Sequence, residues 1–151
     1  MVDFPRVRRA FYRVVEVLFR TWGVRANRMT IDPCVDADAH QAKAWRQFAH
    51  ALCRGPFNVC FARAAETELT DAQLIAISIH EAGHVIAEEL ELPAHAASRD
   101  DDSEKTPEPV QAEADDIIFR ITGLRIVYNG RTCQEVDVAA FEALERRVVW
   151  R

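Results

Sequence analysis

Two histidines and a glutamate lie close together in the middle of the chain, in residues 80–84 (HEAGH). Residues four apart on a helix share one face, so the imidazoles of His80 and His84 can reach a single metal ion. Zinc binds such nitrogens at about 2.0–2.1 Å, and a catalytic site leaves one coordination position to water. Glu81 is placed to take a proton from that water as general base. The pattern therefore predicts a hydrolytic site with Zn²⁺ as its cofactor.

The third ligand must come from another part of the chain, because one helical turn supplies only the two histidines. The residues further on with a suitable carboxylate or imidazole are Glu108, Glu113, Asp115, Asp116, Asp137 and His95. Spacing alone does not choose among them.

A helix over residues 71–92 must position the two histidines. Thr70 and Gln73 match a capping box, in which each side chain satisfies a backbone amide at the start of the helix. Pro93 is placed to stop the helix. Gly83 has no side chain beyond hydrogen, so another element can pack closely against the helix beneath the ion.

The fold class predicted from the whole chain is mainly α, a compact helical domain of the zincin type with an N-terminal basic amphipathic helix. Apolar spacing and breaker residues predict helices over residues 4–22, 38–52, 71–92 and 110–122, and from a second capping-box pattern at 132–135 to Trp150. Residues 124–128 either continue a helix or form a short strand. The type of the apolar segment 57–65 is left open.

Residues 69–73 (LTDAQ) followed by residues 79–87 (IHEAGHVIA) resemble the zinc-binding part of the FtsH family of AAA proteases. In that family an Asp motif further on opens a helix that ends in paired arginines, and residues 137–147 (DVAAFEALERR) are similar to it. The resemblance implies a zinc metalloendopeptidase in which Asp137 is the third ligand beside His80 and His84. It covers about half of the chain.

The same resemblance divides the chain into residues 1–66, an N-terminal helical extension, and residues 67–151, the metallopeptidase-like core, which together form one compact unit. The sequence has no ATPase module and no phosphate-binding glycine loop, so the expected activity is ATP-independent. The expected substrate is a peptide or a protein.

Two other interpretations stay open. Residues 111–115 (QAEAD) are similar to the Glu-x-x-Ala-Asn/Asp helix of other zincins, including the ImmA/IrrE-like regulatory peptidases, which would make Glu113 the ligand. The Glu of that pattern falls on Gln111, however, and a neutral amide is a poor zinc ligand. Glu113 and Asp116 can alternatively orient a ligand histidine through its far nitrogen. The second interpretation is a catalytically silent metal-binding module with a regulatory or interaction role.

Charge is unevenly distributed along the 151 residues. Residues 1–63 carry a net charge of +6 and residues 64–151 a net charge of −11. Arginines without interleaved aromatic residues are weak evidence for nucleic-acid binding, so no nucleic-acid partner is expected. The basic helix instead packs on the core, or meets an acidic protein partner or a second copy of the chain. With no signal peptide, no transmembrane anchor and four cysteines outside any CxxC pair, we expect a cytoplasmic protein.

Overall fold

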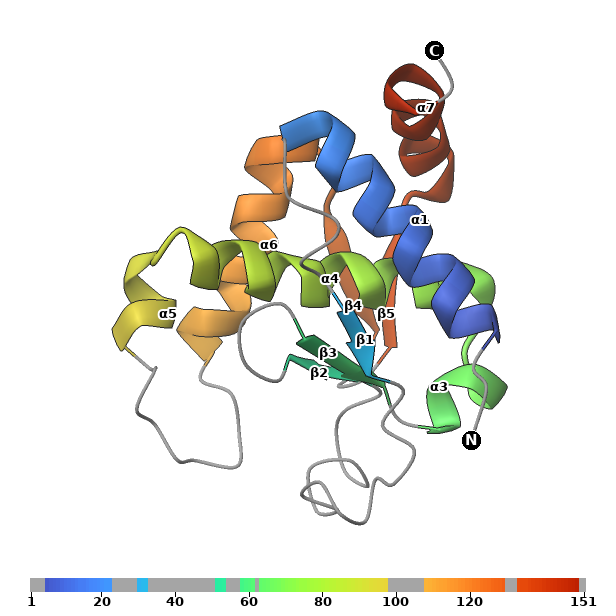
Figure 1. The fold of residues 1–151 in the computed structure, drawn as a ribbon, viewed down its shortest axis with the longest axis horizontal. Helices are drawn as coiled ribbons and strands as arrows, with labels where there is room; N and C mark the ends of the chain where they lie inside the picture. The colour runs from blue at the N-terminus through green and yellow to red at the C-terminus, as the bar shows by residue number, and fades with distance from the viewer. Residues whose placement is uncertain are drawn as a thin grey trace.

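The computed structural model describes residues 5–22, 30–32, 51–53, 58–61, 63–97, 108–129 and 133–149, and over these residues the chain is mainly helical, as predicted (Figure 1). In chain order the elements are α1 (Pro5–Trp22), β1 (Thr30–Asp32), β2 (Ala51–Cys53), β3 (Asn58–Phe61), α3 (Arg63–Glu68), α4 (Asp71–Glu89), α5 (Pro93–Ala97), α6 (Glu108–Thr122), β4 (Ile126–Asn129), β5 (Cys133–Val136) and α7 (Val138–Val148). None of these helices is long and apolar enough to cross a membrane.

Helix α4, which carries the HEAGH motif, begins at the predicted capping box. The Gln73 amide nitrogen donates to Thr70 Oγ1 at 3.1 Å, and the Thr70 amide nitrogen donates to Gln73 Oε1 at 2.9 Å. The helix ends at Glu89, three residues before the predicted end, because Glu91 adopts a positive φ of 53°. Every residue from 74 to 87 is buried, so other elements cover all sides of this segment.

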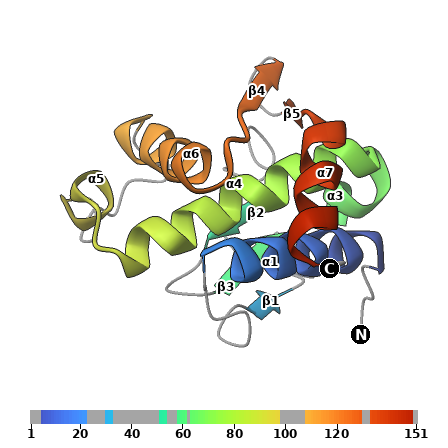
Figure 2. The ribbon, with the colours of Figure 1, turned by 90° about the horizontal axis from the view of Figure 1, so that it is seen from above.

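Two long helices lie on opposite sides of α4 (Figure 2). Helix α1 packs an apolar face on it that includes Val7, Phe11, Val14 and Leu18, all at most 2% exposed. Helix α6 packs from the other side through Ile117 and Ile118. The N-terminal helix and the HEAGH helix therefore share one hydrophobic core.

Helices α4 and α6 approach each other closely at Gly83. A Cβ atom at this position would lie 2.5 Å from the Ala114 carbonyl oxygen and 3.0 Å from Ile118 Cγ1. Real Cβ atoms do not come that close to a backbone oxygen, so only glycine lets α6 lie at this distance. The expectation of close packing beneath the histidines is confirmed.

The strands form two small sheets. In the first, β3 lies between β1, to which it is parallel, and β2, to which it is antiparallel. This sheet lies beside α4 (Figure 1). In the second, β4 and β5 form an antiparallel hairpin in which Ile126 pairs with Val136.

Two of the predicted helices need correction. The helix expected over residues 38–52 does not reach its predicted end, because Ala51–Cys53 is strand β2; residues 38–50 lie outside the described residues. The helix expected from residue 132 begins instead at Val138, and Cys133–Val136 is strand β5. Pairing with β4 outweighs the local capping pattern there, and buried Val136 next to exposed Glu135 shows the two-residue period of a strand. The segment 124–128, left open, contains the start of β4.

Arg6 and Arg13 of α1 bind acidic residues of other helices in the same molecule. Arg6 donates to Asp71 Oδ1 at 2.8 Å and to the Glu66 carbonyl oxygen at 2.7 Å. Arg13 makes a two-pronged contact with Glu145 of α7, at 2.7 and 2.9 Å. The basic N-terminal segment thus meets acidic side chains of its own chain, which confirms that α1 packs on the core.

The contact at Gly83 generates the first prediction. Alanine would favour the helical backbone by about 1 kcal/mol, but its methyl group would push α6 away at a cost of about 1–3 kcal/mol. We expect Gly83→Ala to lower the free energy of unfolding, measured by urea denaturation. Because the two effects have opposite signs, a variant more stable than the wild type would show that α6 does not pack this closely.

Candidate metal centre

Three atoms that can each offer a lone pair converge between α4 and α6. His80 Nε2 and His84 Nε2 lie 3.1 Å apart, and Gln111 Oε1 lies 2.7 Å from the first and 2.9 Å from the second. We call these three atoms the acceptor triangle. Both imidazoles are buried, at 3% and 7% exposure, as expected for a site shielded from bulk water.

Asp115 fixes the orientation of His80. Its Oδ1 lies 2.6 Å from His80 Nδ1, and the hydroxyl of Tyr128 on β4 donates to the other carboxylate oxygen. An ionised carboxylate can only accept, so His80 Nδ1 carries a proton that it donates to Asp115. Burial raises the pKa of Tyr128, and its hydrogen bond to Asp115 raises it further, so the hydroxyl stays protonated.

His84 has a partner of a different kind on its outer side. Its Nδ1 lies 2.9 Å from Nε2 of His95 on α5, and His95 Nδ1 lies 2.6 Å from Glu113 Oε1. Burial opposes ionisation of Glu113, but hydrogen bonds from the Ala94 amide and from His95 outweigh it and lower the pKa of the carboxyl. Glu113 is therefore an ionised acceptor.

The electrostatics of the two inner histidines differ. Burial lowers the pKa of His80, but the hydrogen bond with Asp115 and the charge of Glu81 outweigh this, so its pKa lies above 6.5. Burial, and then the charge of His80, lower the pKa of His84 well below 6.5. In the metal-free protein a single proton on His80 Nε2 can be shared with Gln111 Oε1 and His84 Nε2. A metal cation bound between these three atoms would take the place of that proton.

Glu81 lies on the same helix and is 5% exposed. Burial raises its pKa to about 7, with the charge of His80 lowering it and that of Asp115 raising it. A general base is most effective when its pKa lies near the operating pH. Glu81 is therefore suited to exchange a proton near neutrality.

The acceptor triangle fits a zinc ion in spacing and in donor type. Three ligand atoms at about 2.0–2.2 Å from one tetrahedral ion lie roughly 3.3 Å from each other, so the side chains need to separate only slightly from their present 2.7–3.1 Å. Two neutral imidazoles plus one oxygen match the usual composition of a catalytic site, with a fourth position for water. The unusual ligand atom would be Gln111 Oε1, because it is an amide oxygen and carries no charge.

The third ligand predicted from the sequence, Asp137, is not brought to the histidines. It is the N-cap of α7, and its Oδ1 accepts from the Ala140 amide at 3.1 Å on the exposed surface. No three His, Cys, Asp or Glu side chains among the described residues are grouped so that they could hold an ion. The side chain that lies next to the inner nitrogens of both histidines is instead that of Gln111.

The other candidate residues have different roles. Asp115, Glu113 and His95 surround the two histidines but bind their outer nitrogens, directly or through one another. Asp116 is 57% exposed and pairs with Arg120. Glu108 is an exposed residue of the first turn of α6. Of the two acids expected to orient a ligand histidine, Glu113 contacts His95, which in turn contacts His84, and Asp116 pairs with Arg120 instead.

Sequence reasoning rejected Gln111 as a ligand and did not consider Tyr128. A signal for Gln111 and Asp115 was present, because residues four apart on α6 share the face that packs on α4. Tyr128 reaches the site only because β4 pairs with β5, and no local pattern indicates where that hairpin lies relative to α4.

Comparison of the chain with protein-family models, with curated proteins and with solved structures found no match. The resemblance to the FtsH proteases therefore stays a prediction, and the site must be interpreted from its own geometry.

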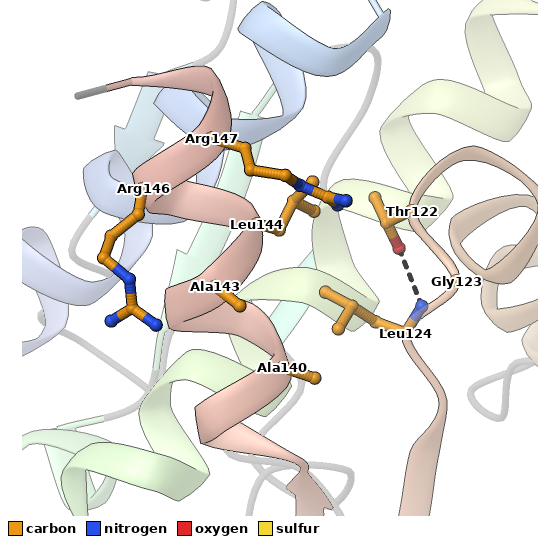
Figure 3. A pocket seen from close by; sticks show the side chains of 8 residues that line it. All are labelled: Thr122, Gly123, Leu124, Ala140, Ala143, Leu144, Arg146 and Arg147. Carbon is orange, nitrogen blue, oxygen red and sulfur yellow. Dashed lines mark hydrogen bonds between the residues drawn. The ribbon is translucent and has the colours of Figure 1, made fainter. Parts of the chain in front are cut away.

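An open cavity of about 480 Å³ lies elsewhere, between α7 and the segment that follows α6 (Figure 3). Leu124 and Leu144 contribute to its wall, and the Arg147 side chain extends toward Thr122. None of its lining residues belongs to the acceptor triangle or touches it. The cavity therefore supplies nothing to the histidines.

The two candidates for the third ligand can be separated by zinc titration against a chromophoric chelator. We expect Gln111→Leu to weaken zinc binding by at least about tenfold, since even residues behind the ligands typically contribute 10–100-fold. Asp137→Asn keeps the helix cap and removes only the charge, so it should bind zinc as the wild type does. If Asp137→Asn weakens binding and Gln111→Leu does not, Asp137 is the ligand.

Proposed function

We propose that this protein is a zinc-dependent metallopeptidase of the HExxH kind, with His80, His84 and Gln111 as ligands and Glu81 as general base. The observation that carries the proposal is the acceptor triangle, in which three lone-pair atoms from two helices converge within 3.1 Å of each other. A structural zinc site prefers four Cys or His ligands and has no use for a neighbouring acid such as Glu81.

Asp115 and Glu81 have different roles in the proposed hydrolysis. Asp115 keeps the proton of His80 on the outer nitrogen, which leaves the Nε2 lone pair pointing inward. Zinc, when bound, supplies the Lewis acidity that acidifies water and polarises a carbonyl group. Glu81 takes the proton of the attacking water and can return it to the leaving amine, because its pKa of about 7 permits both directions.

The neutral amide of Gln111 lowers the affinity for zinc but is compatible with hydrolysis. A site built from three histidines, as in carbonic anhydrase, also has only neutral ligands, and it still brings the pKa of zinc-bound water to about 7. Fewer negative charges on the ligands leave more of the charge of the ion to act on water. We therefore expect weaker metal retention rather than loss of the chemistry.

Glu81→Gln tests the enzymatic role directly. The amide has nearly the same shape but cannot take a proton, so we expect zinc content close to that of the wild type and at least 100-fold slower cleavage. The measurement is cleavage of a diverse peptide library, read by mass spectrometry, on zinc-loaded protein. Asp116→Asn, which removes an exposed carboxylate from α6, is the matched control and should leave the rate unchanged. Undiminished cleavage by Glu81→Gln would exclude it as the base.

A second candidate function is a metal-binding regulatory module without turnover, and the neutral side chain of Gln111 favours it. An amide in place of a carboxylate is the change expected where tight catalytic zinc is no longer needed. Gln111→Glu distinguishes the two functions. The added negative charge should tighten zinc binding by about tenfold or more.

If the wild type cleaves peptides, the enzymatic proposal stands whatever the variant does. If only Gln111→Glu cleaves them, the natural protein is the silent module. Zinc affinity that does not rise in Gln111→Glu would show that residue 111 does not contact the ion.

A further inference from the structure

A chain of three hydrogen-bonded side chains leads outward from the acceptor triangle. It starts at His84 on α4, passes through His95 on the short helix α5, and ends at Glu113 on α6, with contacts of 2.9 and 2.6 Å. Both histidines are buried and the Glu113 side chain is 16% exposed. Hydrolysis as described above uses neither His95 nor Glu113, so their arrangement needs a separate explanation.

The direction of each hydrogen bond follows from the chemistry of the last residue. The Glu113 carboxylate accepts from the amides of Ala94 and His95, each at 2.9 Å, as well as from the His95 ring. Because an ionised carboxylate has no proton to give, His95 Nδ1 must be the donor. With Nδ1 as the donor to Glu113, Nε2 is the nitrogen of His95 that faces His84 Nδ1, at 2.9 Å, and it can accept a proton from it. The remaining lone pair of His84 then lies on Nε2.

We propose that His95 and Glu113 are positioning residues that hold His84 as the tautomer protonated on Nδ1, so that its Nε2 lone pair faces the metal. This inference rests on the metal site proposed above. It explains why α5 is held where it is: Glu113 binds two backbone amides at its start and the ring of the one histidine it carries.

Gln111 makes this role necessary. Its Oε1 lies 2.9 Å from His84 Nε2 and can accept a proton from it. Without an acceptor on the outer side, His84 would gain a hydrogen bond by moving its proton to Nε2, toward Gln111. That tautomer cannot bind a metal until the proton is removed. His95 supplies the competing acceptor that keeps the proton on the outer nitrogen.

Two substitutions at position 95 separate positioning from simple space filling. His95→Leu keeps much of the volume but offers His84 no acceptor. His95→Gln offers a carbonyl oxygen toward His84 and an amide NH₂ toward Glu113, so it preserves the direction of both hydrogen bonds. Asp116→Asn on α6 is the control for a change of charge that does not touch the relay.

The first readout is the tautomer of His84 in the metal-free protein, measured from the ¹⁵N chemical shifts of its ring at about pH 8, above the ordinary imidazole pKa of about 6.5. We expect protonation at Nδ1 in the wild type, in His95→Gln and in Asp116→Asn, and at Nε2 in His95→Leu. The second readout is zinc affinity, which should fall by about 10–100-fold in His95→Leu and in Glu113→Leu and stay near the wild-type value in His95→Gln.

The failure of this inference can be told apart from failure of the proposed function. Wild-type protein that binds no zinc overturns the metal site itself. Zinc binding and a His84 tautomer that are unchanged in His95→Leu overturn only the positioning role. Equal losses of affinity in His95→Gln and His95→Leu also overturn it, because the role would then depend on the shape of the imidazole rather than on the direction of its hydrogen bonds.

Discussion

The close contact between α4 and α6 at Gly83 is the constraint on which the candidate site depends. At that point the Ala114 carbonyl lies where a Cβ atom would otherwise be. Gln111, about one turn before Ala114, and Asp115, directly after it, meet the two histidines with their side chains. A distance of 2.7 Å between Gln111 and His80 cannot survive if the helices move apart by even the radius of a methyl group. The convergence of these side chains is thus a consequence of backbone packing.

Burying three ionisable residues on one helix would be costly unless their polar atoms had partners. Here the outer nitrogen of each inner histidine is bound, one by Asp115 and the other by His95, while both inner nitrogens face Gln111. These partners come from α5 and α6, which follow α4 in the chain. Helices α5 and α6 therefore both cover the histidine-bearing side of α4 and supply the hydrogen bonds of its buried imidazoles.

Features encoded within one or two turns of helix could be predicted from the sequence, and features created by tertiary contact could not. The capping box at Thr70 and the common face of His80 and His84 are local, and the structure has both. Gly83 indicated that some element packs closely against the helix, but no local pattern indicated that this element is α6. The choice of Gln111 over Asp137 depends on how α6 and α7 lie against α4, which no local pattern contains. The last helix was predicted to begin too early for the same reason. The local capping pattern at residues 132–135 is outweighed there by the pairing of β5 with β4.

Part of the negative charge of residues 64–151 lies around the acceptor triangle. A divalent ion held by two imidazoles and an amide receives no charge from its ligands, and a buried uncompensated charge is unfavourable. Asp115 behind His80, Glu113 behind His84 and His95, and Glu81 beside them place three carboxyl groups around the acceptor triangle, all from the acidic half of the chain. Arg6 and Arg13, from the basic half, bind acids at the far side of the core instead. If the proposed site holds a divalent ion, these carboxylates would balance its charge, which would make a neutral third ligand tolerable.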